Sequence, residues 1–396
     1  QLHFEGAVKQ DDQQFDFLNI WNPNLKIKLT EGMAQFALLP YIVEVPTIDF
    51  DFTPDKLDIA QSKVRLGNSD FSLQGSVLEL NKWLGGEANL GGELNFTSDY
   101  TDVNQLMDLT SGFGDKDSTA SESDMSDGDP FMVPKGVDLI LHTRIHRAAI
   151  GSQIANELGG NLYINDGTLV LEEMGFICQA AHLQLTALYK TPRRNHIYTG
   201  LDLHMLDIHI AELLDMIPEA KEMLPMLSSF KGKAEFHLAL ETYMNAKYEL
   251  KTSTSIGAAS LQGKDLVLLD SETFSQIAKL LMFRKKTENI VDSISAEITL
   301  WNRQVDIYPF MMSIDKYAAA VGGQHNLDGT YDYHISLVRP LAIGVNVKTG
   351  DDKKLHIKPT LPRYKSNFEP VRRESVEAQN LKLREKIREE LKRNVK

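Results

Sequence analysis

Cysteine is nearly absent from this chain of 396 residues, which contains only Cys178. A single thiol forms neither an intramolecular disulfide framework nor a CxxC metal site, and its neighbours in GFICQAA predict a small buried side chain. Long apolar runs are missing as well, because no stretch approaches the roughly 20 apolar residues of a membrane-spanning helix. The chain starts with strand-like residues rather than a charged-then-apolar leader, so we expect a processed or excised part of a longer protein.

The familiar catalytic and nucleotide-binding motifs are also missing. The sequence has no G-x-S-x-G elbow, P-loop, GxGxxG or HExxH. Its glycine pairs follow strand-like runs without opening a helix, which favours sharp sheet corners over phosphate binding. These pairs are Gly159-Gly160 and Gly322-Gly323. We therefore expect no catalytic residue, no cofactor and no enzyme activity.

Charge and histidine spacing argue against two further classes of ligand. The net charge of -13 opposes binding to the phosphates of nucleic acid. His142 and His146 share one face of a predicted strand, but no further ligand is spaced alongside them. His204 and His209 are an odd interval apart and point to opposite faces. We expect neither a nucleic acid partner nor a metal site.

What the chain does contain is alternation of apolar and polar residues, the pattern of half-buried strands. The clearest stretch runs from Asp315 to Pro340 and predicts a strand, a glycine corner at Gly322-Gly323 and a second strand. Looser copies of this pattern run from Val64 to Leu80 and from Met174 to Lys190. Repetition of one unit predicts a mainly β fold that grows in one direction as an elongated, bent, antiparallel sheet.

Composition divides the chain into segments. Residues 111–131 are acidic and rich in serine and glycine, which predicts a flexible loop. This loop separates a first β-sheet segment, 1–110, from a second, 132–362. Helical periodicity interrupts the second segment at about 210–228 and 271–284. The end of the chain, 363–396, is a basic tail with a helix.

One apolar side recurs across the predicted strands. It comprises Leu57, Ile59, Phe71, Leu73, Leu162, Ile164, Leu169, Leu171, Leu183, Leu185, Phe236, Leu238, Leu240, Ile298, Leu300, Val305, Ile307, Ile335 and Leu337. Two such sheets facing each other at about 10 Å would make a closed β-sandwich. A single sheet would instead leave an apolar trough for acyl chains. Alternation alone does not distinguish protein from lipid on the far side.

Four stretches, in this order, resemble the C-terminal region of the AsmA family in its Bacteroidota form. They are GNSDFSLQGSVLEL with TSDYTDVNQLM, the acidic insertion followed by VPKGVDLILHTRI, the pair INDGTLVLEEM, and GGQHNLDGTYDYHISLV. Each is weak alone, but their order together with two helical inserts is specific. The similarity covers nearly the whole chain.

The resemblance implies an open β-groove, related to TamB-like bridge proteins, that binds phospholipid and supports lipid transport between membranes and outer-membrane biogenesis. It also implies a periplasmic location, with an anchor in the inner membrane outside this chain and envelope or outer-membrane protein partners. The alternative function is a structural or adhesive β-sandwich that binds a protein or glycan. The C-terminal helix, about 375–395, has a thin apolar stripe of Leu381, Ile387 and Leu391, which favours a solvated end over contact with a membrane or partner.

Overall fold

Most of the chain forms strands, as the alternation predicts. The computed structural model describes residues 25–35, 41–110, 130–150, 153–216, 230–268, 279, 289–314, 317–327, 330–339, 342–349, 354–362 and 375–392. Its strands are β1 (Leu25–Gln35), β2 (Ile42–Phe52), β3 (Lys56–Leu66), β4 (Ser69–Leu78), β5 (Leu90–Asp102), β6 (Val137–Ile150), β7 (Gln153–Asn165), β8 (Thr168–Ile177), β9 (His182–Arg193), β10 (His196–His209), β11 (Phe230–Met244), β12 (Ile256–Leu268), β13 (Asn289–Trp301), β14 (Gln304–Ile314), β15 (Tyr317–Asn326), β16 (Tyr331–Arg339), β17 (Ile343–Thr349) and β18 (Leu355–Thr360).

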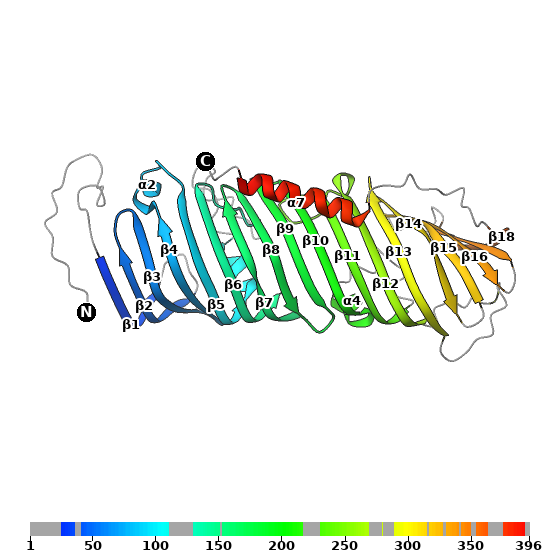
Figure 1. Cartoon of the computed structure of the whole chain (residues 1–396), viewed down its shortest axis with the longest axis horizontal. Helices are drawn as coiled ribbons and strands as arrows, with labels where there is room; N and C mark the ends of the chain where they lie inside the picture. The colour runs from blue at the N-terminus through cyan, green and yellow to red at the C-terminus, as the bar shows by residue number, and fades with distance from the viewer. Residues whose placement is uncertain are drawn as a thin grey trace.

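These strands form one 18-stranded sheet in which each strand pairs with the next along the chain. Figure 1 shows an elongated sheet with β1 at one end and β18 at the other. The pairs are antiparallel except β5 with β6, which is parallel. Two parallel neighbours need a crossover connection, which returns the chain from the end of β5 to the end of the sheet at which β5 began. The predicted elongated β fold is therefore confirmed, with one parallel step that the alternation did not indicate.

Few helices accompany the sheet in the described ranges. They are α2 (Leu80–Leu84), α3 (Val103–Thr110), α4 (Ile210–Met216), the short 3₁₀ turn η2 (Thr252–Thr254) and α7 (Val376–Lys392). The Oδ1 of Asp102 accepts a hydrogen bond from the backbone N–H of Gln105, which caps α3. The first predicted insert begins as α4, but the rest of that insert lies outside the described residues. The same holds for the acidic loop from 111 to 129 and for nearly all of the second insert.

Turn chemistry explains why consecutive strands become neighbours. Between β7 and β8 the two turn residues, Asp166 and Gly167, have φ angles of 38° and 81°. Two positive φ values match the twist of a tight hairpin, and Asp-Gly is among the sequences that adopt them at low cost. Asn165 therefore pairs directly with Thr168. Hairpins of this kind add strands one by one and need no second layer.

The glycine corners expected from the sequence are wrong. Gly322 and Gly323 lie inside β15, and Gly159 and Gly160 lie inside β7. A Cβ on Gly323 would meet the Asp332 carbonyl oxygen at 2.4 Å. These glycines therefore let neighbouring strands approach closely instead of turning the chain.

The closed sandwich is also not what the chain forms, since all described strands belong to one sheet that does not close on itself. Helices lie against both faces of this sheet. α4 packs on one face, where Leu213 and Leu214 join a buried cluster that includes Cys178. This burial confirms the expectation for the thiol. α7 lies across the other face, over the middle of the sheet (Figure 1).

The expectation of a solvated C-terminal helix is wrong. α7 buries Val376, Leu383 and Ile387, spaced seven and four residues apart, and so turns one stripe toward the sheet. Leu383 and Ile387 pack with Val170 of β8 and Leu188 of β9. Leu381, which the sequence placed in the apolar stripe, is 63% exposed. The stripe was misassigned because the face that meets the sheet depends on partners far away in the sequence.

Candidate functional site

The strand register places all of the predicted apolar residues on the same face of the sheet, here called the inner face. For example, Leu171 of β8 lies opposite Leu162 of β7, and Leu238 of β11 lies opposite Leu203 of β10. The same alignment runs from Leu57 in β3 to Leu337 in β16. Because side chains alternate in every strand, one continuous apolar face results. α4 lies on this face and α7 on the opposite, outer face.

The predicted residues differ in how deeply they lie. Leu57, Ile59, Phe71 and Leu73, in β3 and β4, are all half-buried. So are Leu162, Ile164, Leu169, Leu171, Leu185, Phe236, Leu238, Leu240 and Ile335. The buried ones are Leu183, Ile298, Leu300, Val305, Ile307 and Leu337. Among these predicted residues, partial contact with solvent prevails in β3, β4, β7, β8 and β11, whereas those of β13 and β14 are buried.

The inner face is hollowed between β10 and β14. The hollow has a volume of about 180 Å³, and α4 forms part of its wall. Only apolar residues and glycine line it: Leu203, Met205, Ile208, Ile210, Leu213, Ala234, Phe236, Leu238, Leu240, Gly257, Ala258, Ala259, Leu261, Ile298, Leu300 and Val305. A hollow without polar partners does not hold water well, so an apolar occupant fits it best.

A second, smaller lobe of about 40 Å³ adjoins the first, since Ile210, Ala234, Leu261 and Ile298 line both. It extends toward Phe310 of β14. We call the two lobes together the α4 hollow. Like small-molecule sites, it is concave and lined mostly by apolar residues.

Small residues across from large ones create this hollow. Leu238 of β11 faces Ala259 of β12, and Leu240 faces Gly257. A Cβ on Gly257 would lie 3.0 Å from the Ala239 carbonyl oxygen, so a larger residue has little room there. At Ala259, the short side chain leaves open space above the strand. Sequence analysis found Phe236, Leu238 and Leu240 in this region.

Other lining residues were missed. They include Leu203, Met205 and Ile208 of β10, Ile210 and Leu213 of α4, Leu261 of β12 and Phe310 of β14. The alternation in LDLHMLDIHI marks Leu203 and Met205 as inner residues, and that signal was available. Ile208 lies on the inner face because the register shifts after Met205, and the sequence does not predict this shift.

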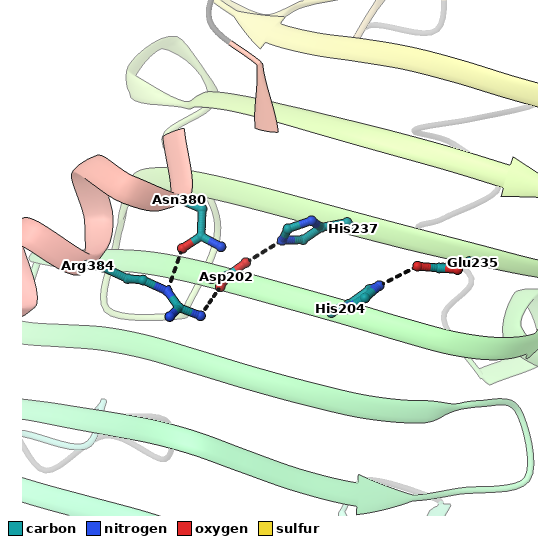
Figure 2. Close-up of polar contacts among 6 residues, drawn as sticks. All are labelled: Asp202, His204, Glu235, His237, Asn380 and Arg384. Atoms are coloured by element: carbon teal, nitrogen blue, oxygen red, sulfur yellow. Dashed lines mark hydrogen bonds and ion pairs between the residues drawn. The ribbon is translucent and has the colours of Figure 1, made fainter. Parts of the chain in front are cut away.

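The outer face of the same strands is polar. Figure 2 shows Asp202 of β10 between His237 of β11 and Arg384 of α7. The His237 Nε2 donates to Asp202 Oδ1 at 2.7 Å, and Arg384 Nη2 lies 3.6 Å from Asp202 Oδ2. The Asn380 Oδ1 accepts from Arg384 Nε at 2.9 Å and holds the guanidinium in place. A buried carboxylate is thus compensated by two donors, and one of them belongs to α7.

Further ion pairs fix α7 along the outer face. Lys190 of β9 pairs with Glu390, and Lys386 pairs with Glu241 of β11. Both ammonium groups also lie near the ring of Tyr198. Burial beneath the helix and the adjacent Glu241 carboxylate raise the pKa of the Tyr198 phenol. α7 therefore braces from outside the strands that form the hollow inside.

The histidines make hydrogen-bonded pairs rather than a ligand set. His204 bonds Glu235 at 2.7 Å beside the His237–Asp202 pair (Figure 2). His142 bonds both Glu93 and Asn161. In the described part of the chain, no group of three or more His, Cys, Asp or Glu side chains is arranged to hold a metal ion. The hollow is accordingly the candidate site.

Fold and site together define a class: a single open β-sheet with an apolar hollow on one face and a helical brace on the other. No family model, curated protein or solved structure matched the chain. Among the described helices, none has both the length and the apolar character needed to cross a bilayer. The class rests on geometry alone.

Proposed function

We propose that this chain is a non-enzymatic, AsmA-like protein that holds phospholipid acyl chains on its inner face and takes part in lipid transport between membranes and in outer-membrane biogenesis. The observation that carries the proposal is the α4 hollow, whose lining contains only apolar residues and glycine. No nucleophile or acid–base pair has been found facing the hollow within the described ranges, so the proposal assigns binding and not a reaction.

Acyl chains suit this face for energetic reasons. Each methylene moved from water into an apolar site gains about 0.8 kcal/mol, so a fatty tail binds through the sum of many weak contacts. The half-buried residues of β3, β4, β7 and β8 continue the apolar surface beyond the hollow. A tail in contact with such a surface can move along it without leaving a single deep site. Headgroups would stay at the hydrated rim of the sheet.

The cellular setting is part of the same proposal. We propose that the protein carries out this lipid transfer in the periplasm of the cell envelope. A segment outside this chain would hold it at the inner membrane, and its partners would be envelope or outer-membrane proteins. The order of sequence stretches that resembles the AsmA family supports this setting. The open, elongated sheet agrees with the groove that the resemblance implies.

Native mass spectrometry tests the binding step. The chain, purified without detergent and mixed with vesicles of phosphatidylethanolamine and phosphatidylglycerol, should retain phospholipid adducts. Ala259→Trp adds a large ring inside the hollow and should reduce the bound fraction by about tenfold. Gln262→Trp adds the same ring to the exposed outer side of the same strand and should leave binding unchanged. Reproducible absence of phospholipid from the unmodified chain would contradict the proposal.

A further inference from the structure

The inner face changes character along the sheet. In β3 and β4 its apolar residues are half-buried, and between β10 and β14 they surround an open hollow. In β15, β16 and β17 several of them are sealed: Val321 is 1% exposed, and Leu337 and Val345 are both 0% exposed, while Ile335 and Ile343 are half-buried. Because all these positions share one face by register, the difference concerns space above the sheet and not the direction of the side chains.

The sealed residues form a continuous cluster with the far wall of the hollow. Val321, Tyr333, Leu337, Val345 and Val347 pack in the same buried group as Val305 and Ile307. We call these first five residues the end wall. None of them lines either lobe of the hollow. A side chain without accessible surface cannot touch a ligand unless the protein rearranges.

The end wall also contains a buried phenol. The hydroxyl of Tyr333 is buried and has no hydrogen-bond partner among the described residues. Burial raises the pKa of this phenol well above its ordinary value of 10.0. The 5% exposure of Tyr333 agrees with a closed structure at this place.

We propose that the lipid path of this chain is closed at its C-terminal end: acyl chains occupy the inner face as far as β14 and stop at the end wall. This inference rests on the proposed function and adds to it the end of the sheet at which the lipid path stops. The α4 hollow is then the last site on the path, and lipid must enter and leave through the N-terminal strands or over the rim. The chain acts as a terminal segment of a track and not as a section through which lipid passes from end to end.

Photocrosslinking from single positions tests this. The crosslinker p-benzoylphenylalanine replaces Phe71 in β4, Phe236 in β11, Tyr333 in β16 or, as an outer-face control, Tyr243 in β11. Each variant is irradiated with vesicles of phosphatidylethanolamine and phosphatidylglycerol. We expect lipid adducts at Phe71 and Phe236, and about tenfold fewer at Tyr333 and Tyr243. Equal labelling at Tyr333 and Phe236 would overturn the end wall, whereas labelling at no inner position would overturn the proposed function itself.

A second measurement avoids inserting a bulky group into the wall. Hydrogen exchange of the unmodified chain should slow on lipid addition in β10 to β12 and stay unchanged in β15 to β17. Leu337→Ala should open space in the wall and extend the lipid-dependent slowing into β16. Slowing in β15 to β17 of the unmodified chain would show that lipid passes the wall, and would contradict the inference while leaving lipid binding intact.

Discussion

The two faces of β10, β11 and β12 differ in polarity: the inner face is apolar and the outer face carries charged side chains. On the inner face, Leu203, Phe236 and Leu261 border an empty apolar space. On the outer face, the neighbouring residues Asp202 and His237 form a buried polar network that holds a helix. Strand alternation permits this division, since each residue faces opposite to the next. The polar contacts that hold a helix thus lie on the outer face, while the inner face of the same strands stays apolar.

The largest effect should come from placing a charge on the inner face. Leu261→Lys puts an ammonium group at the junction of the two lobes, where no polar partner lines the wall. An unpaired charge in an apolar site costs several kcal/mol, so phospholipid binding should fall by about tenfold or more. Native mass spectrometry with the same vesicles measures the bound fraction.

Its matched control is one residue away. Gln262→Lys carries the same charge on the outer face, where position 262 is exposed and lies opposite Glu235. Lipid binding and the unfolding midpoint should both stay near those of the unmodified chain. Equal loss of binding in the two variants would mean that the faces are not functionally distinct. The unfolding midpoint of Leu261→Lys, measured in parallel, shows whether its loss of binding is caused by unfolding.

The next effect concerns the apolar attachment of the brace. Leu383 of α7 is 1% exposed against Val170 and Leu188, and its truncation to Ala should cost roughly 2–5 kcal/mol. Leu381→Ala, at a 63% exposed position of the same helix, should change stability by less than about 0.5 kcal/mol. Urea unfolding measures the global cost, and hydrogen exchange of α7 shows whether the helix detaches first. Equal effects of the two substitutions would place α7 off the sheet.

The polar attachment should matter less. Asp202→Asn keeps the shape of the side chain and an acceptor for His237 but removes the charge that faces Arg384, at a cost of about 1–3 kcal/mol. Glu235, the partner of His204, is more exposed than Asp202, so Glu235→Gln should change the free energy of unfolding by less than about 0.5 kcal/mol. Both are measured by urea unfolding. A stabilised Asp202→Asn variant would indicate that burial of the carboxylate is not compensated by its two donors.

A structural feature could be predicted from the sequence where it depends on neighbouring residues in one strand, and not where it depends on pairing between strands. The inner face was predictable because alternation is written directly in each strand, as in the Leu169 and Leu171 pair of β8. The α4 hollow was not, because it arises where Leu238 meets Ala259 and Leu240 meets Gly257 across strands. Such pairing depends on register, which turns and bulges set.

The brace illustrates the same limit for a helix. Its periodicity predicted a helix near 375–395, and α7 spans Val376–Lys392. Its buried stripe was predicted only in part, since Ile387 is buried as expected but Leu381 is exposed and Leu383, which was missed, is buried. The face of an amphipathic helix with few apolar residues is selected by what it packs on. Here that surface comes from β8 and β9, about two hundred residues earlier in the chain.

The smallest predicted effect is a pH dependence on the outer face, away from α7. His142 of β6 has acceptors at both ring nitrogens: Asn161 Oδ1 at 2.8 Å and Glu93 Oε1 at 2.9 Å. The hydrogen bond to Asn161 contributes most, followed by that to Glu93, and together they raise the pKa of His142 above its ordinary value of 6.5. Only the protonated ring can donate from both nitrogens, so the charged form is the one the fold favours.

The sign of the effect on stability follows from that direction. A raised pKa means that the contribution of His142 is complete at pH values below 6.5 and is lost as the pH rises through the higher folded value. A proton NMR titration of the ring should therefore give a midpoint above 6.5, and Asn161→Ala should lower it more than Glu93→Gln does. On the inner side of the same strands, Leu141 and Leu162 carry no such group, so substituting them should not move the midpoint. A midpoint at or below 6.5 in the unmodified chain would show that the outer face does not hold its polar network closed in solution.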